Sequence, residues 1–145
     1  MSMPIDRAQR IVPPSTAFSL TSTRRKHPRV INRNHVSFIH KLPCIVCGTR
    51  RNIESAHVKM GNPLYGKEPG GTLRPDDSFT VPLCAAHHDE QHSMSEADFW
   101  MALAIDPLRL ALALFDSTGD EERAEKIIQA HREQQIDCQR PEGDR

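Results

Sequence analysis

The spacing of apolar and polar positions divides the chain into an irregular first part and a helical last part. Residues 1–28 show no apolar period and hold four prolines, which predicts a flexible arm. From Val30 to Leu42 a weak helical period predicts a short helix that ends before Pro43. Short apolar segments at 53–58 and 79–83 predict two strands. The 60–78 segment between them holds four glycines and three prolines, and a loop of that length inside a domain is usually functional or disordered.

Helical patterns dominate the chain after residue 84. A helix is expected over 85–92, and Ser95 followed by Asp98 is a variant of the capping box that predicts the start of another. Asp106 and Pro107 supply an N-cap and a first helical residue for a third helix, which Gly119 closes. A last helix begins near residue 120 and should bury one stripe: Ala124, Ile127, Ile128 and His131. Two strands among these helices predict an α+β fold.

Composition limits the size of the core and the place of the protein in the cell. Only 37% of the 145 residues are hydrophobic, below the roughly 45–50% of an average domain, so we expect one modest core. No apolar run approaches the roughly 20 residues of a membrane span, and the prolines near the start make a poor secretory signal. We therefore expect a cytoplasmic protein with no membrane partner. The expected layout is a flexible basic arm (1–28), a core domain (29–95), a helical extension (96–137) and a disordered tail (138–145).

The net charge of zero hides an uneven distribution of charge. Residues 1–41 carry +7, residues 42–95 carry −1 and residues 96–145 carry −6. Such asymmetry points to a basic arm that meets a polyanion and an acidic end that does not. The alternative for the arm is a solubilising tail.

Cysteine and histidine residues form two pairs with the spacing of a zinc site. Without an export signal, metal binding is favoured over disulfides. Zinc takes four such ligands in a tetrahedron. The predicted structural zinc ligands are Cys44, Cys47, Cys84 and His87, with His88 as the alternative to His87.

Three further histidines predict a second site. His88 and His92 are four residues apart, so on a helix they lie on one face and could chelate a divalent cation. The alternative is a solvated helix face. His57 lies on a predicted strand, and a neutral imidazole can take a proton from water near physiological pH. Together the three histidines point to a general base beside a metal ion.

The motifs LPCIVCG, SAHV, YGK and RPDDSFTVPLCAAHHDEQH, in this order, resemble the HNH (ββα-metal, His-Me finger) endonucleases on a treble-clef zinc scaffold. The resemblance covers about residues 35–105. Within these endonucleases, the motifs resemble most specifically the phage and prophage enzymes, including those of the recombination-enhancement type. It implies a small zinc-stabilised core and metal-dependent hydrolysis of DNA phosphodiester bonds.

The resemblance also implies roles for single residues. His57 matches the general base, and His88 and His92 match the ligands of the catalytic ion, expected to be Mg²⁺ or Mn²⁺, with Zn²⁺ or Ni²⁺ possible. Asp77 takes the place of the middle Asn of the HNH motif. Because Ala56 precedes the base where relatives often carry a ligand, Asp76 or Asp77 is expected to supply an oxygen to the ion, and Asp76 is the residue assigned to it.

Basic residues in or beside the arm and the long loop are the expected DNA contacts. They are Arg24, Arg25, Lys26, Arg29, Lys59, Lys67 and Arg74. Contacts of this kind give salt-dependent and mostly sequence-independent affinity. Two other classes stay open: a non-catalytic zinc module that binds nucleic acid or protein, and a helical interaction protein whose partner surface is 96–137.

Overall fold

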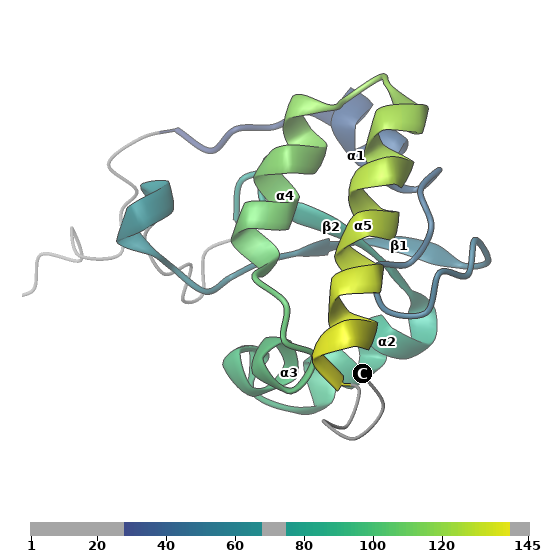
Figure 1. Ribbon diagram of the computed structural model, residues 1–145. Coiled ribbons are helices and arrows are strands. Elements are labelled where there is room, and N and C mark those ends of the chain that lie inside the picture. The colour runs from purple at the N-terminus through teal and green to yellow at the C-terminus, as the bar shows by residue number, and fades with distance from the viewer. Residues whose placement is uncertain (1–27, 68–74, 140–145) are drawn as a thin grey trace, which may run out of the picture.

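The computed structural model describes residues 28–67 and 75–139 (Figure 1). All but residue 28 of the expected arm lies outside the described residues, as do residues 140–145 of the expected tail. Five α-helices, one 3-10 turn and a two-stranded sheet make up the described part, which confirms the α+β class. In order, they are α1 (Arg33–Ile39), β1 (Ile53–His57), η3 (Pro63–Tyr65), β2 (Thr80–Cys84), α2 (Ala85–Ser93), α3 (Glu96–Ala102), α4 (Pro107–Asp116) and α5 (Glu121–Gln139).

An antiparallel hairpin forms the centre of the fold. β1 and β2 pair from Ile53 opposite Cys84 to His57 opposite Thr80. Every residue of β2 is buried, which explains why its sequence is a continuous apolar run and not an alternating one. Both strands lie within one residue of the segments predicted for them. The register places Cys84 at one end of the hairpin and His57 at the other.

The helices cover the hairpin and begin where capping residues dictate. α1 packs against both strands, while α4 packs against β2 and against α5 (Figure 1). The Asp106 side chain accepts from the amide of Arg109 and Pro107 is the first residue of α4, as predicted. Ser95 likewise accepts from the amide of Asp98 at the start of α3, so this capping interaction is confirmed.

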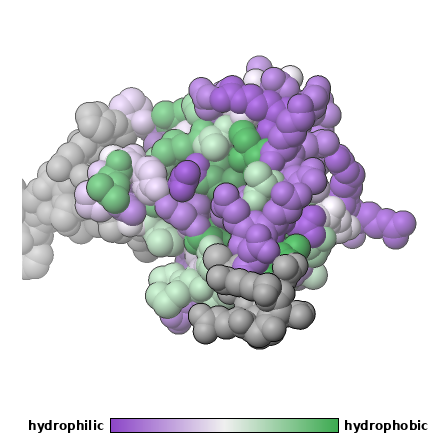
Figure 2. Space-filling view, viewed as in Figure 1, coloured by the Kyte–Doolittle hydropathy of each residue, from purple (hydrophilic) through white to green (hydrophobic). Residues whose placement is uncertain are grey.

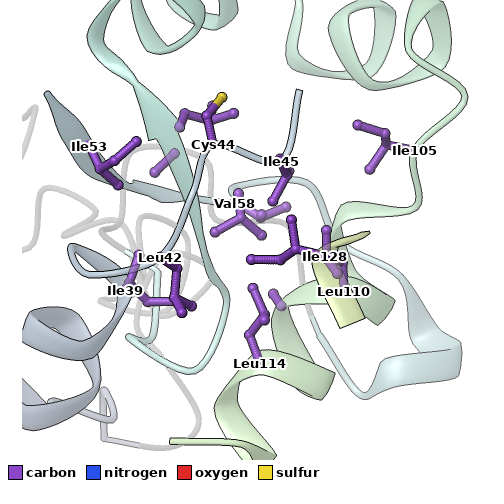
Figure 3. Packing of buried hydrophobic residues seen from close by; sticks show 14 of the residues in the cluster. Ile39, Leu42, Cys44, Ile45, Ile53, Val58, Ile105, Leu110, Leu114 and Ile128 are labelled. Atoms are coloured by element: carbon purple, nitrogen blue, oxygen red, sulfur yellow. The ribbon is translucent and has the colours of Figure 1, made fainter. Parts of the chain in front are cut away.

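One apolar core joins the hairpin to the helices on either side. Figure 3 shows side chains from α1, from the loop after it, from α4 and from α5 converging on the strands. Fully buried members are Ile39, Leu42, Cys44, Ile45, Val58, Leu114 and Ile128. Each such side chain contributes roughly 1.5–3 kcal/mol through burial. The core therefore depends on the chain segment that carries Cys44.

The last helix has one buried stripe and a polar outer face. Ala124 and Ile128 are buried, and Ile127 and His131 are partly buried, which agrees with the predicted stripe. Hydrophilic side chains cover the side of the molecule on which α5 lies (Figure 2). The helix continues to Gln139, two residues past the expected boundary. Among the described helices, none combines the length and apolar character that crossing a bilayer requires.

Candidate metal centre and histidine cluster

Three cysteines and one histidine converge at one end of the hairpin. The ligand atoms of Cys44, Cys47, Cys84 and His87 all lie within 4.8 Å of one another. His87 Nδ1 is 3.1 Å from the sulfur of Cys84 and 3.7 Å from that of Cys44. The sulfurs of Cys47 and Cys84 are 3.9 Å apart. Sulfur atoms on a tetrahedral Zn²⁺ with bonds of about 2.3 Å are about 3.8 Å apart, so this set fits zinc.

Local backbone structure brings these ligands together. Gly48 has a φ of 74° and its amide donates to the carbonyl of Cys44, so the chain turns tightly after the first pair. The amide of Ile45 donates to the carbonyl of Pro82, which ties this turn to β2. Cys84 ends β2 and is the N-cap of α2, so His87 follows in the first turn of the helix. His87 is thus the fourth residue of the cluster, in place of His88.

A histidine and a carboxylate meet at the opposite end of the hairpin. His57 Nε2 lies 2.9 Å from Asp77 Oδ1. Their side chains are 13% and 5% exposed, so the pair is largely shielded from water while the imidazole keeps some access. His57 is the last residue of β1, and Asp77 stands three residues before β2. The two strands therefore bring together residues that are 20 positions apart.

Asp77 is held by more than its histidine partner. The Arg29 guanidinium lies 3.0 Å from Oδ1, and the amide of Asn32 donates to Oδ2 at 2.8 Å. Burial raises the pKa of Asp77, but the hydrogen bonds from His57 and Asn32, with the charge of Arg29, outweigh burial and hold this pKa below its ordinary value. Asp77 is therefore ionised at neutral pH and accepts a proton-bearing nitrogen of His57.

A second histidine is buried close enough to this pair to feel its charges. His35 of α1 is fully buried, and its Nδ1 is 2.7 Å from the hydroxyl of Thr118. Its Nε2 has no hydrogen-bond partner among the described residues. Burial lowers the pKa of His35, an effect that the charge of Asp77 partly opposes. A neutral imidazole is the form that this site stabilises.

His88 and His92 face each other on α2. Their Nε2 atoms are 3.1 Å apart and their ring centroids 4.6 Å apart, as expected for positions one helical turn apart. The other ring nitrogen of His88, Nδ1, lies 2.5 Å from Glu54 Oε2. Two cis ligands of one divalent ion have nitrogen atoms about 3 Å apart, given bonds of about 2.1 Å. The two imidazoles therefore fit a shared ion.

A small pocket of about 150 Å³ lies between a histidine of β1 and a histidine of α2. His57 and His92 both line it, together with Lys59, Gln91, Met94 and Glu96. The Glu96 carboxylate accepts the backbone amides of Lys59 and Met60, and it also accepts from the side chains of Gln91 and Trp100. These bonds fix the chain just after His57 against the start of α3.

Some predicted site residues have other partners. Asp76 accepts the amide of Val30. The Cys/His cluster is the one group of three or more potential metal ligands found among the described residues, so Asp76 is not brought together with His88 and His92. The backbone before α1 engages one oxygen of this carboxylate, and the role expected for Asp76 in holding the ion stays a prediction.

Two of the basic residues expected to contact DNA are engaged within the fold. Arg29 bonds to Asp77 and to the carbonyl of Pro75. Lys67 is 8% exposed, donates to the carbonyl of Lys59 and lies over the Phe79 ring. Lys59 itself is exposed beside the pocket. Arg24, Arg25, Lys26 and Arg74 lie outside the described residues.

Comparison with protein families assigns the chain to one family. A family model described as a protein of unknown function (DUF968) matches residues 11–104. The chain belongs to this family. Comparison with curated proteins and with solved structures gave no match. The part that matches the DUF968 family includes both histidine sites and the Cys/His cluster, and it ends before α4.

Sequence reasoning missed three polar residues of this DUF968 protein that contact or line the histidine site. Glu54 bonds to His88, and Gln91 and Glu96 line the pocket. A lone Glu in a strand carries no motif, although charged residues are depleted in strands and its presence at Glu54 was a weak signal. Glu96 was hidden by its position in the first turn of a helix, where acidic residues are common.

Proposed function

We propose that this protein is a metal-dependent HNH-type endonuclease that hydrolyses DNA phosphodiester bonds. One observation carries the proposal: His57 is paired with the ionised Asp77 and shares a pocket with His92 of the His88–His92 pair. A general base thus stands next to a pair of imidazoles that fit a divalent ion. This constellation is what hydrolysis of a phosphodiester by an activated water requires.

The Asp77 carboxylate defines the role of His57. The ionised Asp77 carboxylate can accept a hydrogen bond but cannot donate one, so Nε2 of the neutral His57 carries the hydrogen. Nδ1 is therefore the nitrogen that can take a proton. Nδ1 removes a proton from a water as that water attacks phosphorus. The negative charge of Asp77 then stabilises the imidazolium that forms.

The Nε2 atoms of His88 and His92 would hold the catalytic ion. Mg²⁺ or Mn²⁺ is the proposed ion, and imidazole ligands also accept Zn²⁺ or Ni²⁺. When bound, the ion neutralises charge on the scissile phosphate and on the departing oxygen. Lys59, exposed at the pocket, is positioned to contact the phosphate backbone of DNA.

The Cys/His cluster supports this site from a distance. A zinc ion held by its four residues would join the turn after α1, the end of β2 and the start of α2 into a treble-clef unit. The cluster offers no open position, so its role is structural. It keeps α2 directed along the hairpin toward His57.

Cleavage of supercoiled plasmid tests the proposed activity. The zinc-loaded protein should nick or linearise plasmid with Mg²⁺ or Mn²⁺, and His57→Ala should lower the rate by about 10²–10⁴-fold because the base is lost. Zinc content and far-UV circular dichroism should be unchanged in this variant.

A matched variant guards against a general effect of losing a histidine. His40→Ala removes the imidazole that bonds to the carbonyl of Ile53, at the other end of β1 from His57. This variant should keep its activity. Wild-type protein that cleaves no DNA with any of the four ions, or His57→Ala protein with full activity, would contradict the proposal.

The second candidate is a non-catalytic zinc module that binds nucleic acid or a partner protein. Ala56 favours it, because this fully buried residue precedes His57 and offers no ligand. Among the described residues, moreover, no carboxylate completes a three-ligand group with His88 and His92. In the plasmid experiment, this reading predicts salt-dependent DNA binding without cleavage by the wild-type protein.

A further inference from the structure

An exposed carboxylate of β1 reaches across to the helix that carries the histidine pair. Glu54 Oε2 is 2.5 Å from His88 Nδ1, and the two side chains are 48% and 20% exposed. His88 Nε2 then lies 3.1 Å from His92 Nε2. The three side chains form a chain of contacts in which each end of the His88 ring has a polar partner.

The position of Glu54 has no explanation in packing. It lies opposite Leu83 in the hairpin, yet it is exposed and contributes nothing to the apolar core. Glu is depleted in strands, and an exposed ion pair of this kind contributes about 0–1 kcal/mol to stability. The contact with His88 is the feature that distinguishes this side chain.

The Glu54 contact determines which nitrogen of His88 can bind a cation. An ionised carboxylate accepts the hydrogen of Nδ1, so the lone pair of His88 is left on Nε2, which faces His92. Free imidazole side chains favour the opposite tautomer, with the hydrogen on Nε2. Carboxylate partners of this kind orient histidine ligands in metalloproteins and raise their basicity.

We propose that Glu54 is a positioning residue that keeps His88 in the Nδ1–H tautomer. The Nε2 atoms of His88 and His92 thereby form a preorganised two-nitrogen site for a divalent cation. This inference rests on the proposed function, since it concerns the ion assigned to the nuclease site. It adds the requirement of a carboxylate partner for His88, which the helical spacing of the two histidines does not imply.

The tautomer of His88 can be measured without any ion at the histidine pair. Nitrogen-15 NMR of the zinc-loaded protein above pH 8 should show His88 with its hydrogen on Nδ1. In Glu54→Ala the hydrogen should move largely to Nε2. Glu90→Ala is the matched control, because Glu90 is an exposed acid of α2 that accepts the hydroxyl of Ser93 through its backbone carbonyl, and this change should leave the tautomer unchanged.

Calorimetric titration measures the consequence for binding, with Ni²⁺ and Mn²⁺ as probes. Zinc-loaded wild-type protein should bind one further ion, and His92→Ala should lose that binding. Glu54→Ala should weaken it by about 10–100-fold, as for other carboxylate partners of histidine ligands. Glu54→Gln, whose amide oxygen accepts but carries no charge, should fall between the two. Glu90→Ala should stay within about threefold of wild type.

The possible results separate this inference from the proposed function. If Glu54→Ala keeps the Nδ1–H tautomer and the wild-type affinity, the positioning role is overturned while the nuclease proposal stands. Equal losses in Glu54→Ala and Glu90→Ala would also overturn it, because general charge would then be the cause. A wild-type protein that binds no further ion would overturn both the inference and the metal assignment of the proposed function.

Discussion

The two ends of the hairpin carry side chains with opposite properties. At the end where Ile53 pairs with Cys84, four potential metal ligands close around one point, and three of them are thiols. At the end where His57 pairs with Thr80, a histidine and a carboxylate border a pocket that also contains His92. A closed set of four ligands favours a structural ion, whereas an incomplete set beside a pocket leaves room for a substrate.

Helix α2 connects these two ends. Its first turn contributes His87 to the Cys/His cluster, and its last turn places His92 at the pocket of His57. Under the proposed function, the Cys/His cluster contributes stability and the His88–His92 pair contributes chemistry, although both include residues of one short helix. Variants at either end should therefore have separable effects.

The largest expected effect comes from removing one ligand of the Cys/His cluster. Cys47→Ala is the suitable change, because Cys47 is exposed and its loss leaves no cavity, unlike the buried Cys44. We expect loss of the zinc ion and of folding free energy on the order of 5 kcal/mol or more. Thermal unfolding by circular dichroism and assay of bound zinc would measure both.

The matched change at the other end of α2 is His92→Ala. This variant should keep its zinc ion and its unfolding temperature, because His92 is an exposed residue outside the cluster. Equal destabilisation by Cys47→Ala and His92→Ala would remove the distinction between the two ends.

The next effect concerns the reaction and not the fold. Asp77→Asn should lower plasmid cleavage by about 10²–10⁴-fold, because the amide can donate to Nε2 of His57 and so stabilise the wrong tautomer. Weaker bonds from Arg29 and Asn32 should also lower the free energy of unfolding by about 1–3 kcal/mol. Initial cleavage rates and denaturant unfolding would separate these two effects.

Asp76→Asn is the control for this variant. The neighbouring carboxylate accepts the amide of Val30, and the amide oxygen of Asn can take over that bond. Its zinc content and cleavage rate should match wild type. If Asp76→Asn were as inactive as Asp77→Asn, the loss of cleavage could not be assigned to the His57–Asp77 pair.

The smallest expected effect is a dependence of stability on pH at His35, the buried histidine of α1. Its pKa is lowered by burial from an ordinary value of 6.5, so the unfolded chain takes up a proton more readily than the folded one. The contribution of neutral His35 is fully present above about pH 6.5 and declines as the pH falls below that value. His35→Phe should therefore lose less unfolding temperature than wild type between pH 8 and pH 5.5. Zinc content must be checked at both pH values, and an identical loss in the two proteins would refute the role of His35.

Much of the local structure was predictable from the sequence. The caps at Ser95 and Asp106 appear where the residue pattern places them. The four ligands of the Cys/His cluster follow from their spacing. These features depend on residues near one another in the chain, or on a ligand chemistry that few other residue types provide.

Contacts between distant segments were harder to predict. Nothing in the pattern around Arg29 or Lys67 marks them as internal partners of Asp77 and of the Lys59 carbonyl. Asp76 and Asp77 are neighbours in sequence, and only the path of the chain before α1 decides that one bonds to Val30 while the other also reaches His57. Charge alone does not distinguish Asp76 from Asp77 as the partner of His57.

The elements, the caps and the members of the Cys/His cluster follow from the amino-acid sequence, because short-range periodicity and side-chain chemistry decide these. The end of the hairpin at which each histidine lies, and the carboxylate with which it pairs, became clear only from the tertiary structure. The register of β1 and β2 sets His57 against the loop of Asp77 and directs Glu54 toward His88. A strand register depends on pairing between distant residues, so it becomes fixed only when the whole core is packed.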